Sequence, residues 1–166
     1  FTGTFDFITD FEHTEYGTKN AFIFFKHKRF SLGTCINEHF TPLLLLRSGL
    51  APVSDYLDKI NDHARRYHSN PYRNYPNEEL WRIGFSKGFQ PDGPQNVGYT
   101  KGALFFDELD FRIREKSGGQ RKLEDMMRPL FEQRRRGHPL TLEVLRGAIA
   151  RELGDSGREL FDSVIT

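Results

Sequence analysis

The chain has 166 residues, 37% of them hydrophobic and 28% charged, a composition that suits one folded domain and argues against a disordered protein. Its 24 basic and 23 acidic side chains leave a formal net charge of +1, which argues against a nucleic-acid-binding surface. No apolar run approaches the roughly 18 residues that a membrane-spanning helix needs.

The cellular compartment and the oligomeric state cannot be read from the cysteine content or from the first residue. Cys35 is the single cysteine, so no disulfide can form within the chain. The sequence begins with Phe1 rather than methionine and has no secretory segment. We therefore expect it to be a piece of a longer precursor.

Strands are predicted near the beginning of the chain. Between Phe1 and Phe11 the odd positions are mostly phenylalanine and the even positions mostly polar, which is the period of a half-buried strand. Ala21 to Phe25 is a second short apolar run, and a turn around Gly17 separates the two. The pattern predicts a β-hairpin, so that residues 1–30 form the strand-rich part of a single domain covering residues 1–166.

Residues 31–166 are predicted to be mainly helical. Pro42 is expected to interrupt the chain before a leucine-rich helix that runs from Leu43 towards Arg47. Ser54 is expected to cap a second helix, whose apolar face consists of Tyr56, Leu57, Ile60, Ala64 and Tyr67. The stretch from Ser69 to Gln95, rich in Asn, Pro, Gly and aromatic residues, is interpreted as a long ordered loop.

The last third carries the clearest helical patterns. A helix from Gly102 to Lys116 is expected to stop at Gly118-Gly119, and Thr141 is expected to cap another before a final short helix. Between them, one helix face is formed by Leu123, Met126, Met127, Leu130 and Phe131. Pro129 within that pattern should cost about 3 kcal/mol or kink the helix. The predicted class is α+β, mainly α, with a short N-terminal hairpin and about five helices.

Tyr99 is the first candidate for chemistry. It lies in the segment Gly98-Tyr99-Thr100-Lys101-Gly102, at the predicted start of a helix. A tyrosine at such a boundary can direct its phenol into a cleft and donate a hydrogen bond to a developing oxyanion. The alternative is a tyrosine that only packs beside the helix start.

A second candidate region is the segment around Glu38 and His39. Adjacent residues on a helix point about 100° apart, so one metal ion would not readily bind both. Cys35 and His39 are the one pair of soft ligands at helical i, i+4 spacing, whereas zinc takes three or four ligands. We interpret that pair as a chance spacing. The chain contains no H-E-x-x-H motif, and its run of arginines at 134–136 is interpreted as a solvated helix end.

Several segments, in order along the chain, resemble the glycyl-aminopeptidase family of zinc metallopeptidases, which are thermolysin-like gluzincins. The similar segments are GTKNAF at 17–22, LLLLRSGL at 43–50, YTKGAL at 99–104, REKSGG at 114–119 and LFD at 160–162. The resemblance covers most of the chain and implies that residues 31–166 form the helical lobe of such a peptidase.

The resemblance also implies roles for Tyr99 and Glu38. In this family two histidines of H-E-x-x-H and a downstream glutamate bind zinc, the motif glutamate activates water, and a tyrosine stabilises the tetrahedral intermediate. Tyr99 matches that tyrosine. Glu38 is the third zinc ligand if His39 replaces a glycine of the family pattern. It is the general base if Asn37 and Thr41 replace the two histidines.

On either alignment the zinc site is incomplete, so we expect this chain alone to lack metallopeptidase activity and to bind no zinc tightly. The first hypothesis is therefore a fragment or degenerate form of a zinc aminopeptidase catalytic domain. If the natural protein has an internal segment that this chain lacks, it is an active zinc aminopeptidase instead. An intact mass of 19.4 kDa would exclude that version for the molecule in hand.

Two further hypotheses do not involve catalysis by zinc. One is a peptide-binding or interaction module with a cleft near Tyr99 and an aromatic loop from Tyr72 to Phe89, whose partner is a peptide or protein. The other is a poorly folded fragment that exposes its phenylalanines and aggregates.

Overall fold

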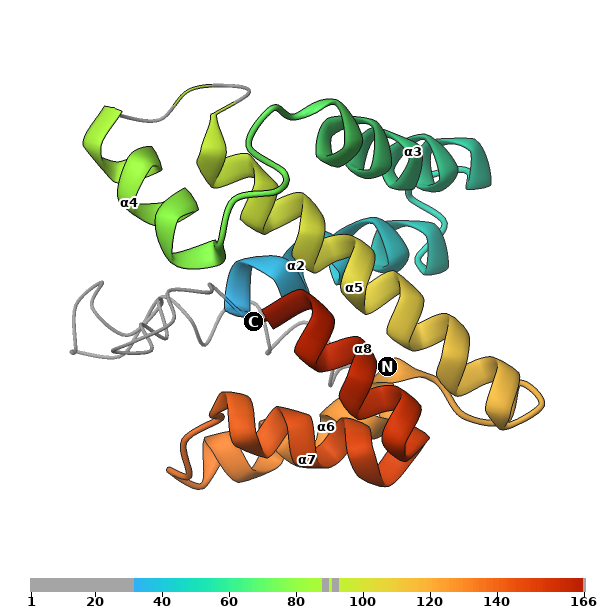
Figure 1. The fold of residues 1–166 in the computed structure, drawn as a ribbon. Helices are drawn as coiled ribbons and strands as arrows, with labels where there is room; N and C mark the ends of the chain where they lie inside the picture. Colours follow the sequence, from blue (N-terminus) through green and yellow to red (C-terminus); the bar gives the residue numbers. More distant parts are fainter. Residues whose placement is uncertain (1–31, 88–89, 91–92, 166) are drawn as a thin grey trace.

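The computed structural model describes residues 32–87, 90 and 93–165. Within these residues the chain forms seven α-helices and no strand (Figure 1). The helices are α2 (Leu32–Arg47), α3 (Val53–Ser69), α4 (Asn77–Lys87), α5 (Pro94–Lys116), α6 (Leu123–Arg135), α7 (Leu142–Leu153) and α8 (Asp155–Ile165).

The predicted α+β class is therefore wrong for the part of the chain that the structure describes, which is all-helical. The prediction depended on the period-two pattern of residues 1–25, and the proposed hairpin lies outside the described residues. The number of helices was also underestimated, because the region between 69 and 95 contains a helix that the sequence did not indicate.

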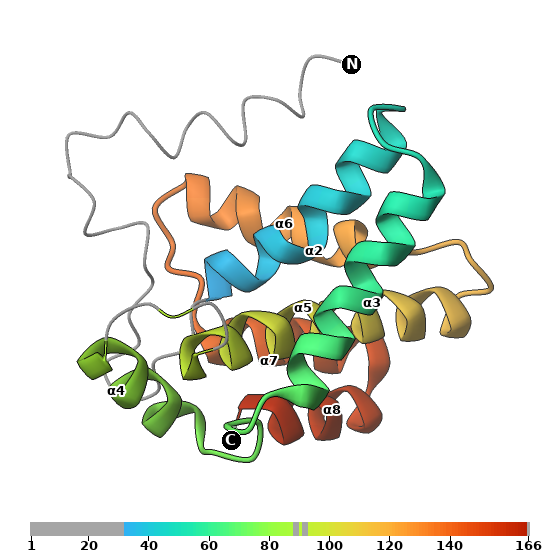
Figure 2. The ribbon, with the colours of Figure 1, turned by 90° about the horizontal axis from the view of Figure 1, so that it is seen from above.

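Helix α5 is the central element and contacts each of the other described helices. In Figure 1, α3 lies above it, α4 to the left of its first turns, and α6, α7 and α8 below it, while Figure 2 shows α2 beside it. Its buried face includes Phe106, Leu109 and Ile113, all at 1% exposure or less. Burial of this face, rather than helix propensity, is what stabilises so long an element.

One hydrophobic core joins α5 to four neighbouring helices and to Leu140. Its members are Cys35 and Ile36 of α2, Phe105, Phe106, Leu109 and Ile113 of α5, Leu123, Met126, Met127 and Leu130 of α6, Leu142, Leu145, Ala148, Ile149 and Leu153 of α7, Phe161 and Ile165 of α8, and Leu140 before α7. The predicted apolar face of residues 123–131 is confirmed, with Phe131 packed partly buried against the core. Helix α3 contributes no member to this core.

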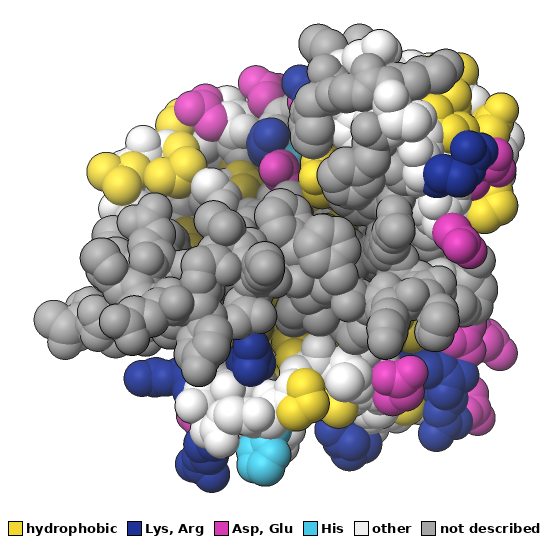
Figure 3. Space-filling model, turned by 90° about the vertical axis from the view of Figure 1, so that its left-hand side faces the viewer, with side chains coloured by type: hydrophobic (Ala, Val, Ile, Leu, Met, Phe, Trp, Pro, Cys, Tyr) yellow, Lys and Arg dark blue, Asp and Glu magenta, His cyan; other side chains and the backbone are white. Residues whose placement is uncertain are grey.

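None of the described helices is both long and apolar enough to cross a lipid bilayer. The described surface carries charges of both signs, and Figure 3 shows Lys and Arg side chains next to Asp and Glu side chains on one face.

Two prolines lie inside helices, which corrects the expectation that Pro42 interrupts the chain. Helix α2 continues through Pro42, and α6 continues through the exposed Pro129. A proline removes one backbone hydrogen bond and strains the preceding turn. Buried neighbours compensate, since Leu43 is buried beside Pro42, and Leu130 is buried beside Pro129.

Helix α4 corrects the interpretation of residues 69–95 as a loop. Leu80 on its inner face is 1% exposed, and Asn77 at its first position donates hydrogen bonds from Nδ2 to the carbonyl oxygens of Val164 (3.1 Å) and Ile165 (3.2 Å). The last carbonyls of a helix have no partner within the helix, so Asn77 satisfies two of those at the end of α8. Ile165 is 88 residues from Asn77 in the sequence, so no local sequence pattern around Asn77 could indicate this contact.

The ends of the C-terminal helices follow the predicted signals. Gly118 and Gly119 adopt φ angles of 61° and 82°, which end α5, and Thr141 Oγ1 accepts a hydrogen bond from the Val144 amide at 3.2 Å, which caps α7. Ser54, by contrast, lies inside α3, because the N-cap position is occupied by Pro52.

Helices α7 and α8 approach each other closely at Gly157. A Cβ atom there would lie 2.8 Å from Leu153 Cβ and 2.9 Å from Ile149 Cγ2, so Gly157→Ala should lower the free energy of unfolding by about 1–3 kcal/mol. Urea denaturation measures this. Gly147→Ala in α7 is the matched control, because its Cβ would meet nothing nearer than 3.6 Å and should stabilise the helix by up to about 1 kcal/mol. Equal effects of the two substitutions would contradict the close approach at Gly157.

Candidate functional site

Glu38 and Tyr99, the two residues singled out from the sequence, lie on neighbouring helices. Cys35 Sγ donates a hydrogen bond to the carbonyl oxygen of Gly98 at 3.5 Å, which places this turn of α2 against the first part of α5. Glu38 follows Cys35 by three residues and therefore shares its side of α2, while Tyr99 directly follows Gly98. Both side chains are partly exposed.

The carboxylate of Glu38 is bound by two side chains of α3. His63 Nε2 lies 3.2 Å from Glu38 Oε2, and Lys59 Nζ lies 3.6 Å from the same oxygen. An ionised carboxylate only accepts hydrogen bonds, so His63 Nε2 carries the proton and donates it. The His63 side chain is 4% exposed and that of Glu38 36%, so the pair reaches from the interior to the surface.

The pKa values of Glu38 and Tyr99 are shifted in opposite directions by their surroundings. The hydrogen bond from His63, and then the positive charge of Lys59, hold the pKa of Glu38 below its ordinary value of 4.5 against the opposing effect of burial. Burial raises the pKa of the Tyr99 phenol, and the negative charge of Glu38 raises it further. At neutral pH the Tyr99 phenol is therefore protonated and the Glu38 carboxylate ionised.

Cys35 and His39, the pair at helical i, i+4 spacing, have separate partners. His39 Nδ1 donates to Asp107 Oδ1 of α5 at 2.6 Å, whereas the Cys35 thiol is directed at Gly98. Burial, followed by the negative charge of Glu38, raises the pKa of the Cys35 thiol, so the thiolate that a metal would need is disfavoured. The two residues serve the α2–α5 interface.

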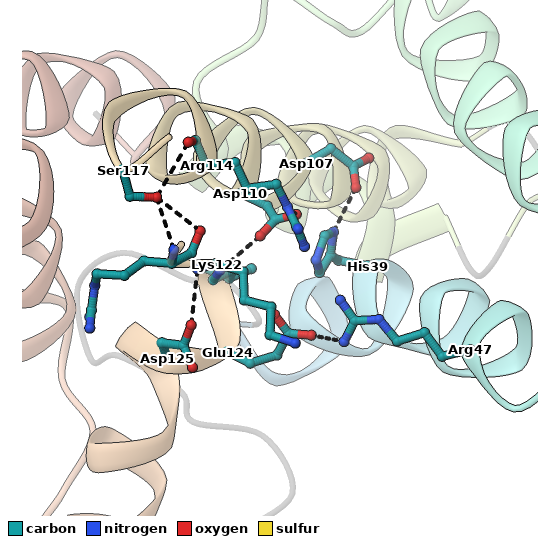
Figure 4. A network of polar contacts seen from close by, with 11 residues as sticks. His39, Arg47, Asp107, Asp110, Arg114, Ser117, Lys122, Glu124 and Asp125 are labelled. Carbon is teal, nitrogen blue, oxygen red and sulfur yellow. Dashed lines mark hydrogen bonds and ion pairs between the residues drawn. The ribbon is translucent and has the colours of Figure 1, made fainter. Parts of the chain in front are cut away.

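His39 belongs to a polar network between α2, α5 and α6 (Figure 4). Asp110 accepts a hydrogen bond from the backbone amide of Leu123 at 2.7 Å and another from Arg114 Nε at 2.7 Å, so α5 caps the first turn of α6. Arg47 of α2 forms an ion pair with Glu124 of α6. This network ties α2 and α6 to α5 but contributes no group to the surface around Glu38 and Tyr99.

The described residues do not fit a tight zinc site. Nowhere in the described ranges do three or more His, Cys, Asp or Glu side chains gather in a way that could hold a metal ion. Glu38 and His63 provide only two ligand side chains, and the ammonium group of Lys59 beside them repels a cation. Asn37 and Thr41, which one alignment puts in place of the family's histidines, are exposed on α2.

His63 is the site residue that the sequence did not indicate. It follows Tyr56 by seven residues and Ile60 by three, which puts it on the predicted apolar face of α3. That face contains only one fully buried residue, His63 itself, while Leu57 is 51% exposed. Helical register was therefore the signal that could have found it.

The aromatic stretch from Tyr72 to Phe89 is not a single loop. The rings of Tyr72 and Tyr75 contact each other with centroids 5.5 Å apart, and the chain then enters α4. Tyr75 is exposed, so the contact forms part of the surface.

Comparison of the chain with family models, with curated protein sequences and with solved structures gives no match.

The Glu38–His63 contact predicts a pH-dependent stability. Because the folded-state pKa of Glu38 is lowered, its contribution is fully present above pH 4.5 and is lost as the pH falls through the folded-state pKa. We expect Glu38→Gln to lower the free energy of unfolding by about 0.5–1 kcal/mol at pH 7, because the site is partly exposed.

Urea denaturation between pH 7 and pH 3 measures the difference in unfolding free energy between Glu38→Gln and the unmodified chain, which should shrink below pH 4.5. Glu115→Gln on the exposed side of α5 is the matched control and should show little difference at any pH. A difference for Glu38→Gln that does not change with pH would contradict the role of its charge.

Proposed function

We propose that this chain is a fragment or degenerate form of a zinc aminopeptidase catalytic domain and that, alone, it does not hydrolyse peptides. One observation carries the proposal. Tyr99 lies in a segment that resembles the family, Glu38 matches a family glutamate on either alignment, and a contact between Cys35 and Gly98 brings their two helices together. In the resembled enzymes, residues of these two kinds act on one substrate bond, which requires such proximity.

The lack of hydrolysis is inferred from the partners of Glu38. When bound, zinc would supply a Lewis acid and an activated water. Here His63 and Lys59 contact the carboxylate that would otherwise accept the metal or activate water. Lys59 and His63 together stabilise the negative charge of the Glu38 carboxylate, so this charge needs no metal ion to balance it.

A zinc and activity assay tests the proposal. We expect the chain, at a confirmed mass of 19.4 kDa, to retain far less than stoichiometric zinc after dialysis. We also expect no chelator-sensitive release of aminomethylcoumarin from aminoacyl substrates, because too few ligands gather around Glu38. Stoichiometric zinc together with zinc-dependent hydrolysis would overturn the proposal and favour an active aminopeptidase.

A second candidate, peptide binding without hydrolysis, is favoured by the pairing of a donor with an acceptor. A protonated Tyr99 can donate to a peptide carbonyl, and an ionised Glu38 can accept from an amino terminus. A peptide amino terminus would take the place of Lys59, whose 3.6 Å contact with Glu38 is longer than a hydrogen bond. Such a site would bind short peptides with a free amino terminus.

Peptide binding is tested by titrating a short peptide in its free and N-acetylated forms. Tyr99→Phe should weaken the binding of both forms by roughly twofold to tenfold, because one hydrogen bond is lost. Glu38→Gln should weaken the free form selectively. Tyr75→Phe, an exposed tyrosine remote in sequence, is the control. Equal affinity for the two peptide forms would argue against the role given to Glu38.

A further inference from the structure

A hollow between α7 and α8 plays no part in the site around Glu38 and Tyr99. Its volume is about 320 Å³, and it is lined by Glu143, Arg146, Gly147, Ala150, Arg151 and Arg158. All but the last of these lie on α7 at the spacing of one helix face. A volume of this size is at the lower end of what small-molecule sites occupy.

The lining is rich in guanidinium groups, which suit an anion. The lining residues include three arginines and a single glutamate, Glu143. A guanidinium presents five N–H groups in a planar fork that matches the oxygens of a phosphate or carboxylate. Arg151 has no ion-pair partner among the residues that the structure describes, so its donors are available.

The other two arginines are held in place by carboxylates of α8. Arg146 donates to Asp162 through Nε at 2.8 Å and Nη2 at 2.5 Å, and Arg158 forms an ion pair with Asp155. These contacts leave further N–H groups on each guanidinium and restrict its motion, so less conformational entropy is lost when an anion binds. They also offset part of the positive charge, and we therefore expect weak, millimolar-range affinity for a bare anion.

Gly147 is a glycine in the interior of α7 and lines the hollow. Glycine in a helix interior is less stable than alanine, so its presence usually reflects packing or function. Packing does not require it here, because an added Cβ would meet only Arg151 Nη1, at 3.6 Å. At Gly157, by contrast, close packing does require the glycine. The bare backbone of Gly147 keeps the floor of the hollow open beside the Arg151 guanidinium.

We propose that this hollow binds an oxyanion, and that the group it fits is the phosphate of a small phosphorylated molecule. Arg151 donates to the phosphate from beside Gly147, and Arg146 and Arg158 donate from the two helices. A phosphate group presents three acceptor oxygens to the three guanidinium groups of the lining, whereas a carboxylate presents two.

Binding is tested on the full chain, labelled with nitrogen-15, by titration with inorganic phosphate at constant ionic strength. The backbone amides around Gly147 and Arg151 should shift, and Arg151→Met should weaken the binding roughly tenfold. Arg128→Met, at an exposed arginine of α6, should leave the affinity unchanged. The absence of shifts in α7 would overturn the proposal, and acetate binding as tightly as phosphate would overturn the assignment of phosphate.

Gly147→Ala separates a binding role from a structural one. The added methyl group should raise the Tm by about 2–4 °C, because alanine is the better helix former. It should also lower the affinity for inorganic phosphate, because it fills the floor of the hollow. A higher Tm with unchanged phosphate affinity would overturn the placement of the site at Gly147. These results are independent of the zinc and peptide assays on the site around Glu38.

Discussion

The burial of α5 is the constraint on which the described structure depends. This helix touches every other described helix, and the burial of Phe106, Leu109 and Ile113 fixes its rotation about its own axis. Tyr99 precedes Phe106 by seven residues, almost two full turns, so it points to nearly the same side as that buried ring. Since the ring of His39 in α2 also lies beside Phe106, the core determines that Tyr99 faces the helix that carries Glu38.

Polar residues at the boundary of this core give the interface between α2, α3 and α5 its specificity. Asp107 accepts a hydrogen bond from the buried His39, and Glu38 accepts one from the buried His63. A buried polar group without a partner costs more than a hydrogen bond contributes, so each pairing favours one register of the helices over its alternatives. The carboxylate of Glu38 is thereby paired with side chains of the chain itself.

The sequence could predict elements whose signals are local. The apolar face of residues 123–131, the Thr141 cap and the glycine stop after Lys116 were all found in this way. The sequence could also nominate Glu38 and Tyr99, through the family resemblance. It could not supply the partners of Glu38 and His39, because these depend on how helices pack across tens of residues. Helix α4 was missed for the same reason, since its first residue is anchored by the end of α8.

Cys35 gives the chain an internal reporter of its own dynamics. The thiol is 1% exposed at the contact between α2 and the start of α5, and the sequence contains no other cysteine. A thiol reagent can reach it only when these two helices separate, and burial also keeps the thiol in its unreactive protonated form. The alkylation rate of the native chain therefore measures how often α2 opens away from α5. That motion would also separate Glu38 from Tyr99, so one chemical label follows the integrity of the candidate site.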